Sequence, residues 1–186
     1  MAAKKLPEHE FLVRTLKYDA ESGLLLWKNR PETDFTSTRV ARIWNTKYAG
    51  KVAGNERPEK FGGGVCVVIG NVSYLAHRIA WKLVTGDDIE DGVEIDHVNL
   101  DRSDNRWDNL RLASRRENGQ HRPVMKNSKS GLKGVFKCSY IERPWIARIR
   151  HDGKDVHLGA FYTKGLAAVA YAKASLRYQG KFSIYA

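Results

Sequence analysis

The segment 94–99, EIDHVN, places a carboxylate beside an imidazole between apolar residues. In an extended strand, adjacent side chains point to opposite faces, so Asp96 and His97 can perform two tasks at one place. A neutral imidazole is a general base near physiological pH, and a carboxylate oxygen is a hard ligand for a divalent cation. An isolated Asp-His pair is more often a hydrogen-bonded structural pair, so a catalytic reading depends on the surrounding residues.

Two asparagines follow this pair at fixed intervals. Asn109 lies twelve residues after His97, and Asn118 lies nine residues further along the chain. The pattern between and after them predicts a short strand, NLRLAS, and a polar helix, SRRENGQHR, which Ser114 caps. The expected local order is therefore strand, loop, strand and helix.

Together with HRIAW upstream and ENGQ downstream, this series resembles the HNH nucleases, in particular the phage homing endonucleases whose third position is Asn. The resemblance covers roughly residues 76–121 and implies the ββα-metal fold and hydrolysis of DNA phosphodiester bonds. His97 would be the general base, and Asn109 would hold the loop and orient His97. Asp96 and Asn118 would hold one Mg²⁺, with Mn²⁺ as a substitute, and no structural zinc is expected.

Several neighbouring residues keep more than one interpretation. His77 and Arg78 begin a predicted helix, where they would contact a DNA phosphate or cap the helix. His121 is a substitute metal ligand, a phosphate contact or a surface residue. The alternative function for the whole chain is a DNA-binding regulator with a degenerate, inactive HNH centre, and an RNA-binding adaptor is a more distant third.

Other elements upstream are expected to support these residues. The segment VCVVIGNVSYLA predicts a hairpin that turns at Gly70 and Asn71, and HRIAWKLVTG predicts a helix that ends at Gly86. Residues 61–124 are expected to form the HNH module. Residues 1–60 are expected to be an N-terminal strand and irregular region that supports it, and no chemistry is assigned to the Gly- and Pro-punctuated segment TDFTSTRVARIWNTKYAGKVAGNERPEKFGGG.

The C-terminal part of the chain carries most of the positive charge. The formal net charge is +11, and residues 125–186 hold 12 Lys and Arg against three acidic residues, a net charge of +9. The segments GVFKCS, PWIARIR and DVHLGAF predict three antiparallel strands, and a helix is predicted from Thr163 to Gly180. These segments resemble the Apetala2-type DNA-binding domain, which lays its sheet in the major groove.

Alternation along the second of these strands separates two faces. Trp145, Ala147 and Ile149 share one face, which is expected to pack on the helix. Ile146, Arg148 and Arg150 share the other face, which is expected to meet DNA. Lys133, Lys137 and His157 are expected to flank it. The resemblance is weaker in the first strand and its turn, and Asp155 replaces a basic residue, so no base preference is carried over.

The fold class is therefore predicted to be α+β, an HNH module followed by a small three-stranded sheet plus one helix. The predicted function is a site-specific DNA endonuclease of the homing type. Its expected partner is double-stranded DNA, it is expected to act as a monomer, and no membrane partner is expected. Two Cys without a paired motif and the lack of a long apolar segment favour a soluble, cytoplasmic protein.

Overall fold

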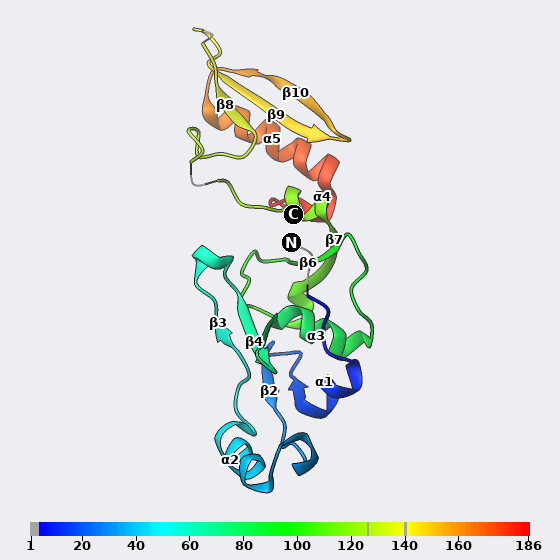
Figure 1. Ribbon diagram of the computed structural model, residues 1–186. Helices are drawn as coiled ribbons and strands as arrows, with labels where there is room; N and C mark the ends of the chain where they lie inside the picture. Colours follow the sequence, from blue (N-terminus) through cyan, green and yellow to red (C-terminus); the bar gives the residue numbers. More distant parts are fainter. Residues whose placement is uncertain (1–3, 126, 140) are drawn as a thin grey trace. The chain divides into compact units, whose positions relative to one another are not determined.

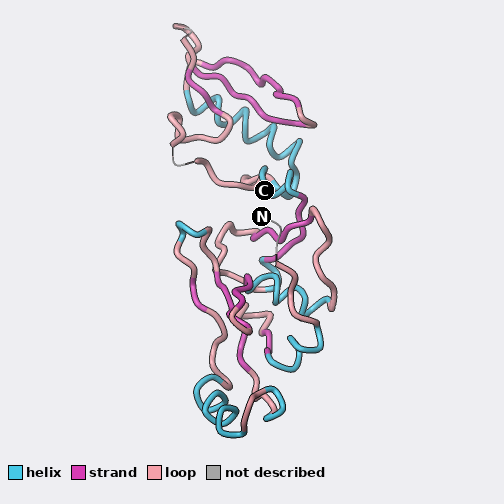
Figure 2. The backbone as a smooth tube through the Cα atoms, viewed as in Figure 1, coloured by secondary structure: helices cyan, strands magenta, loops and turns pink. Residues whose placement is uncertain are grey.

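The computed structural model describes residues 4–125, 127–139 and 141–186 (Figure 1). Small antiparallel sheets alternate with helices along the chain (Figure 2), which confirms a mixed fold of the α+β kind. The chain divides into two compact units, Met1–Ala113 and Ser114–Ala186.

The first unit holds three α-helices and seven short strands among its described residues. Its helices are α1 (His9–Thr15), α2 (Thr38–Tyr48) and α3 (Ala76–Thr85). Its strands are β1 (Leu16–Tyr18), β2 (Leu25–Trp27), β3 (Asn55–Glu56), β4 (Val65–Ile69), β5 (Val72–Leu75), β6 (Val93–His97) and β7 (Leu110–Ser114). The strands form three sheets, with orders β1-β2, β3-β4-β5 and β6-β7.

The β4–β5 hairpin and α3 confirm their sequence predictions. Ile69 pairs with Val72, and Gly70 and Asn71 take positive φ angles of 53° and 66°, as a two-residue hairpin turn requires. Helix α3 follows β5 without a break and ends at Gly86. Its inner face joins the main core of the unit, whose buried members are Leu6, Leu12, Leu16, Leu25, Ala53, Val67, Ala76 and Ile79.

The prediction of an irregular connection over residues 33–64 is wrong in its first part, because this segment contains α2. The Ser37 side chain caps the helix by accepting a hydrogen bond from the Val40 backbone N–H. Trp44 packs edge-on against Trp27 of β2, with ring centroids 5.4 Å apart. The inward positions are only one small residue, two aromatics and one amide, so a search for aliphatic periodicity does not detect the helix.

The second unit holds α4 (Arg115–Gln120), α5 (Lys164–Gln179) and the strands β8 (Val135–Lys137), β9 (Trp145–His151) and β10 (Lys154–Phe161). The strands form one antiparallel sheet in the order β10-β9-β8. Asp152 and Gly153, with φ angles of 46° and 77°, make the β9–β10 turn. Helix α5 packs on the sheet through a face made of small residues and tyrosines, Ala167, Ala170, Tyr171, Ala174 and Tyr178.

Gly134 is the position in this unit where a side chain is least tolerable. Its φ angle is +66°, and a Cβ atom would overlap the Tyr171 ring and lie 2.6 Å from the carbonyl oxygen of Arg148. Gly134→Ala should therefore lower the free energy of unfolding by about 3 kcal/mol or more, measured by urea denaturation of the full-length protein. Gly131→Ala is the matched control, because Gly131 has a similar φ of +67° but open space around it. Equal losses in the two variants would contradict the steric explanation.

Candidate active site

Strand β6 brings the Asp-His pair to the edge of a small core. Ile95 of β6 is buried with Leu110 of β7 and Ala80 of α3. This packing holds the end of β6, and both Asp96 and His97 are 5% exposed. The Asp96 side chain bonds to Arg111 and the His97 side chain to Asn105, as expected for neighbours on opposite faces of a strand.

His97 is held on its Nε2 side. Its Nε2 lies 3.1 Å from Oδ1 of Asn105, a buried contact. The Asn105 amide is oriented by its own Nδ2, which donates to the carbonyl of Ser103 at 3.4 Å. Because Asn105 Oδ1 accepts only, this assignment places the imidazole proton on Nε2 and the lone pair on Nδ1. Burial lowers the pKa of His97, and the Asn105 hydrogen bond opposes that shift, so the neutral imidazole is favoured.

A second imidazole packs against the first. The rings of His77 and His97 meet edge to face, with centroids 5.0 Å apart. Burial, followed by the nearby His97, lowers the pKa of His77 to about 3, so His77 is neutral at physiological pH. The neighbouring Arg78 has a buried Nε atom with no hydrogen-bond partner among the described residues. His77 is therefore next to the proposed base, and the expected DNA contact of His77 and Arg78 stays a prediction.

Asp96 pairs with a cation from the partner strand. Its Oδ2 accepts from Arg111 Nε at 2.9 Å and lies 2.8 Å from Arg111 Nη2. Both side chains are largely buried, at 6% and 15% exposure. The two residues therefore form a mostly buried ion pair between β6 and β7. Arg111 was not singled out by sequence reasoning, although its place two residues after Asn109 on β7 would have put it opposite β6.

Asn109 closes the loop between β6 and β7. Its Oδ1 accepts from the Asn99 backbone N–H at 2.9 Å, and its Nδ2 donates to the Asp104 carbonyl at 2.6 Å. Asn99 Nδ2 in turn donates to Asp104 Oδ2 at 2.7 Å. Asn105, which bonds to the His97 ring, lies in this loop. Asn109 therefore stabilises the loop that contains Asn105, the residue that bonds to His97.

The N-terminal hairpin also holds this loop. Tyr18 of β1 donates its hydroxyl to the Asn105 carbonyl at 2.7 Å, and burial raises the pKa of Tyr18 to about 12. The Trp107 backbone N–H donates to the Ala20 carbonyl at 3.0 Å. A Cβ atom at Gly23 would lie 2.4 Å from the Arg106 backbone nitrogen, so only glycine permits this approach. Residues 16–27 therefore support the loop that positions His97.

Asn118 belongs to α4, in the second unit. The helix begins immediately after β7, and Ser114 and Glu117 form the predicted cap as a complete capping box. Asn118 is half-buried within α4, and His121 ends the helix and is buried. The order of elements along the chain is strand β6, loop, strand β7 and helix α4, as the sequence predicts. The metal-binding role of Asn118 stays a prediction.

The donor chemistry of Asp96 fits a hard divalent cation. A carboxylate oxygen, an asparagine oxygen and waters form a ligand set that suits Mg²⁺ or Mn²⁺, since Mg²⁺ keeps several of its waters in proteins. Within residues 4–125, 127–139 and 141–186, no three His, Cys, Asp or Glu side chains come together as a metal cage. Arg111 already bonds to one oxygen of Asp96, so a cation at this carboxylate would have to share it with the guanidinium.

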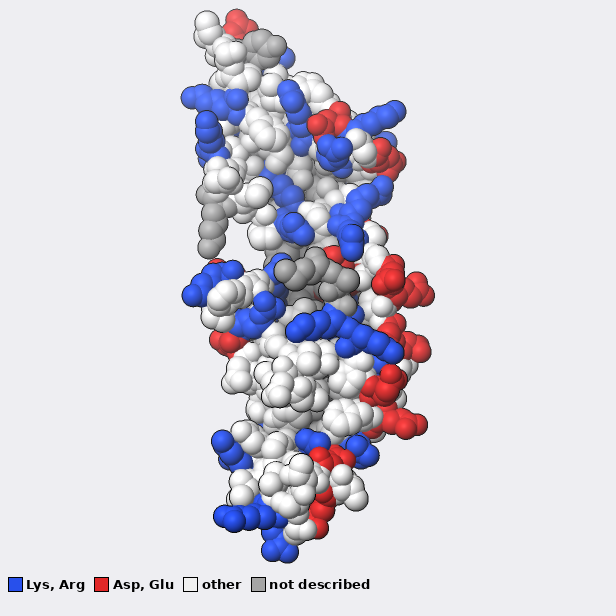
Figure 3. Space-filling view, viewed as in Figure 1, with Lys and Arg blue, Asp and Glu red and all other residues white. Residues whose placement is uncertain are grey.

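The second unit presents a basic sheet face. Arg148 and Arg150 of β9 are exposed, while Ala147 and Ile149 are buried against α5. His157 of β10 lies across from Arg148 in the register. Arg150 lies 3.7 Å from Asp155, and both side chains are mainly exposed. Figure 3 shows Lys and Arg side chains spread over the visible face of this unit.

Three other residues expected on or beside the DNA-binding face are not exposed on the open face of the sheet in the way that Arg148 and Arg150 are. Ile146 is only 8% exposed, although it shares the open face with Arg148. Lys137 pairs with Trp145 in the register, so its exposed side chain points to the other face of the sheet. Lys133 donates from Nζ to the carbonyls of Gln120 and Arg122, and burial lowers its pKa to about 8. Two of its three N–H groups are thus already used within the unit.

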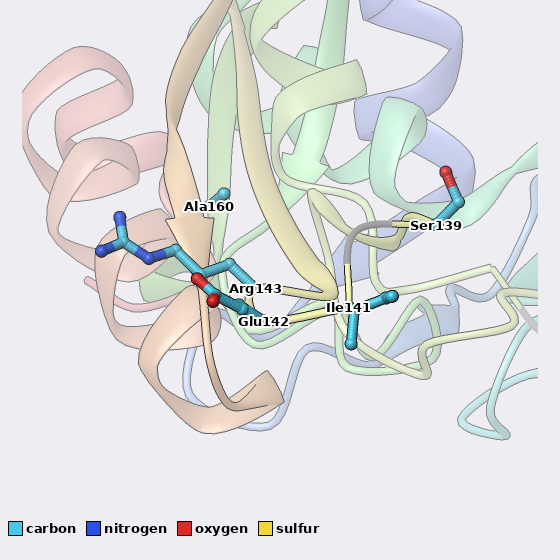
Figure 4. A pocket seen from close by; sticks show the side chains of 5 residues that line it. All are labelled: Ser139, Ile141, Glu142, Arg143 and Ala160. Carbon is cyan, nitrogen blue, oxygen red and sulfur yellow. The ribbon is translucent and has the colours of Figure 1, made fainter.

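A shallow hollow lies beside this sheet, where the β8–β9 connection passes β10 (Figure 4). Its lining residues are Ser139, Ile141, Glu142, Arg143 and Ala160. Ile141 is 98% exposed, and the Arg143 guanidinium lies 5.1 Å from the centre of the Tyr162 ring. The hollow includes none of the candidate catalytic residues.

Comparison with known proteins gives a match over the segment that contains the candidate active site. Residues 74–120 match a family model described as HNH endonuclease. This stretch includes His77, Asp96, His97, Asn109 and Asn118. The comparisons with curated proteins and with solved structures gave no match. The family match supports nuclease activity on DNA. HNH nucleases generally use a divalent metal. The Apetala2-type resemblance of residues 125–186 stays a prediction.

Within the described part of the chain, no helix combines the length and the apolar character that crossing a bilayer requires.

Proposed function

We propose that this protein is a site-specific DNA endonuclease of the homing type, which hydrolyses phosphodiester bonds with His97 as general base. The observation that carries the proposal is the buried His97, bonded through Nε2 to Asn105 and adjacent to Asp96, within the segment that matches the HNH endonuclease family. Activation of water requires a neutral imidazole with one ring nitrogen, here Nδ1, that can accept a proton.

In this mechanism, His97 Nδ1 takes a proton from a water molecule as the oxygen attacks the phosphorus. The 3' oxygen leaves in line with the attack, and a proton from solvent completes the new 3' hydroxyl group. Asn105 keeps the imidazole in the tautomer whose Nδ1 accepts the proton. Asp96 and Asn118 would hold one Mg²⁺ or Mn²⁺, which supplies positive charge to the phosphate in the transition state. The assignment of Asn118 rests on the family match and the sequence spacing.

The basic second unit is proposed to supply affinity and site choice. A nuclease centre that contacts mainly the sugar-phosphate backbone has little means of reading bases, whereas arginines on an open sheet face can reach base edges in the major groove. Arg148, Arg150 and His157 on adjacent strands suit this task. His77 and Arg78 would contribute contacts to phosphate. Lys137 points to the face of the sheet opposite Arg148, and Lys133 is bonded within its own unit, so neither is assigned a DNA contact.

Cleavage of supercoiled plasmid tests the proposed activity. The full-length protein is incubated with plasmid in Mg²⁺, in Mn²⁺ and in EDTA, and the relaxed and linear products are separated on a gel. Metal-dependent relaxation or linearisation supports the endonuclease. Plasmid that stays supercoiled under every metal condition, although the protein binds it, would contradict the proposal.

One observation favours the alternative, a DNA-binding regulator with an inactive centre. The Arg111 guanidinium bonds to Asp96 Oδ2, where the metal ligand is proposed. In a permanently inactive protein this ion pair would simply stabilise the β6–β7 sheet. The plasmid assay distinguishes the two functions, because a regulator binds DNA in Mg²⁺ without cutting it.

Arg148→Ala should weaken DNA binding by about 1–3 kcal/mol if the side chain contacts a base edge. The change is best measured by fluorescence anisotropy with a labelled target duplex in EDTA. Arg177→Ala is the matched control, because Arg177 is an exposed arginine on α5, which packs on the opposite face of the sheet. If both variants bind like the parent protein, or lose affinity equally, the open face of the sheet is not the DNA-binding surface.

A further inference from the structure

Helix α2 has two well-separated faces. With 100° between successive residues, Ala41, Trp44, Asn45 and Tyr48 fall on one side of the helix. Ala41 is 1% exposed, and Trp44 and Asn45 are half-buried. The six residues on the opposite side span an arc of about 160° and are all exposed. These are Arg39, Val40, Arg42, Ile43, Thr46 and Lys47.

The inner face fixes α2 to the rest of the unit. The Arg30 guanidinium lies 4.7 Å from the centre of the Phe35 ring and 5.1 Å from that of Trp44. The Arg30 backbone N–H donates to Asn45 Oδ1 at 3.0 Å, and Asn45 Nδ2 donates to the Arg30 carbonyl at 2.9 Å. Stacking and reciprocal hydrogen bonds therefore hold α2 in one orientation, which keeps its outer face in place.

The outer face keeps its positive charge. Helix α2 contains Arg39, Arg42 and Lys47 and no acidic residue. The acids nearest in sequence, Glu32 and Asp34, bond to residues other than these three cations. Glu32 accepts from the Thr38 hydroxyl at 2.9 Å, and Asp34 pairs with Arg14 at 2.9 Å and with Arg30 at 3.1 Å. Among the described residues, the three cations of the outer face have no acidic partner.

Two large apolar side chains lie between these cations. Val40 is 44% exposed and Ile43 is 58% exposed. Arg39 and Lys47 are eight residues apart, about 12 Å along the helix axis, a span that covers several phosphates of a DNA strand. An α-helix fits the major groove of B-DNA, where cations contact phosphates and apolar side chains contact thymine methyl groups. The chemistry of this face therefore matches duplex DNA.

We propose that the outer face of α2 binds duplex DNA as a contact separate from the active site. Figure 1 shows α2 at the end of the first unit away from β6 and β7, and blue side chains gather at that end in Figure 3. This inference rests on the proposed function, because it takes the DNA substrate as the partner of α2. A bound duplex that reaches α2 extends beyond the scissile phosphate, and this contact helps to place the DNA on the nuclease.

The test compares two double variants of the full-length protein that lose the same charge. Arg39→Ala/Arg42→Ala removes two cations from the outer face of α2. Lys4→Ala/Lys17→Ala removes two exposed cations from the same unit outside α2. Binding to a labelled duplex is measured in EDTA at several salt concentrations, and circular dichroism checks that each variant is folded.

We expect the α2 variant to lose affinity by about tenfold or more, with a salt slope shallower by about 1.8 for two lost phosphate contacts. The control variant should keep nearly the parent affinity and slope. Ile43→Ala should weaken binding without changing the slope, because an apolar contact releases no counterions.

Three results would overturn the proposal. The first is an α2 variant with the affinity and salt slope of the parent. The second is an equal loss in the α2 and control variants, which would show only a general effect of net charge. The third is unchanged DNA binding with a changed mass in light scattering, which would make a second copy of the chain the partner. Binding is measured in EDTA, where no metal-dependent cleavage takes place. A protein that binds DNA through α2 but does not cut the plasmid would therefore contradict the nuclease proposal and leave the α2 proposal intact.

Discussion

His97→Ala should lower the rate of plasmid cleavage by about 10²-fold or more while DNA binding in EDTA stays at the parent level. The variant loses the only proposed acceptor for the proton of the attacking water. His97 is buried between Asn105 and the ring of His77, so its removal also takes away the hydrogen bond to Oδ1 of Asn105. Thermal unfolding of the variant should accompany the cleavage assay, so that a loss of fold is not mistaken for a loss of the base.

Two further variants sharpen this test. His9→Ala removes a histidine from α1 that has no proposed role, and it should cleave at the parent rate. Asn105→Ala keeps the imidazole but removes the contact that fixes its tautomer, so cleavage should fall less than in His97→Ala. Parent-level cleavage by His97→Ala would remove His97 from the mechanism.

The second large effect is expected at Asp96. Asp96→Asn keeps the shape of the side chain but removes its charge, so the proposed metal ligand is weakened. Cleavage should fall by about 10²-fold or more, and the remaining activity should require more Mg²⁺. The measurement is the rate of plasmid cleavage as a function of Mg²⁺ concentration, with DNA affinity measured separately in EDTA.

The ion pair of Asp96 with Arg111 provides the control. Arg111→Gln breaks the same ion pair from the other side and leaves the carboxylate in place. If the carboxylate acts on the metal, Arg111→Gln should cleave far better than Asp96→Asn at saturating Mg²⁺. If the ion pair is purely structural, the two variants should lose stability and activity together, since either change removes one charge of a mostly buried ion pair.

Strand β9 of the second unit shows how much a local sequence pattern can predict. Alternation in β9 correctly assigned Ala147 and Ile149 to the core and Arg148 and Arg150 to the surface, because successive side chains of a strand must point to opposite faces. Ile146 shares the open face but is only 8% exposed. Its cross-strand neighbours, Phe136 and Ala160, come from two other strands, and their pairing is not visible in the sequence of β9 alone.

Helix α2 shows where local patterns fail. Its inner face is held by Arg30, Trp27 and Phe35, which come from the preceding segments of the chain. This helix lacks regular aliphatic spacing, and the sequence signals that do indicate it are Ser37 at the cap and the spacing of Ala41, Trp44 and Tyr48. The cations of its outer face were therefore assigned no role.

The sequence by itself determined the residue types at the candidate site, their spacing, the hairpin before α3 and the capped helix after β7. These features depend on turn chemistry, capping and strand alternation, which act between residues close together in the chain. Only the tertiary structure decided that Asn105 bonds to His97, that Arg111 bonds to Asp96 and that Tyr18 holds the loop from 87 residues away. Such contacts depend on which strands pair and which side chains share a buried space, and no local rule specifies that choice.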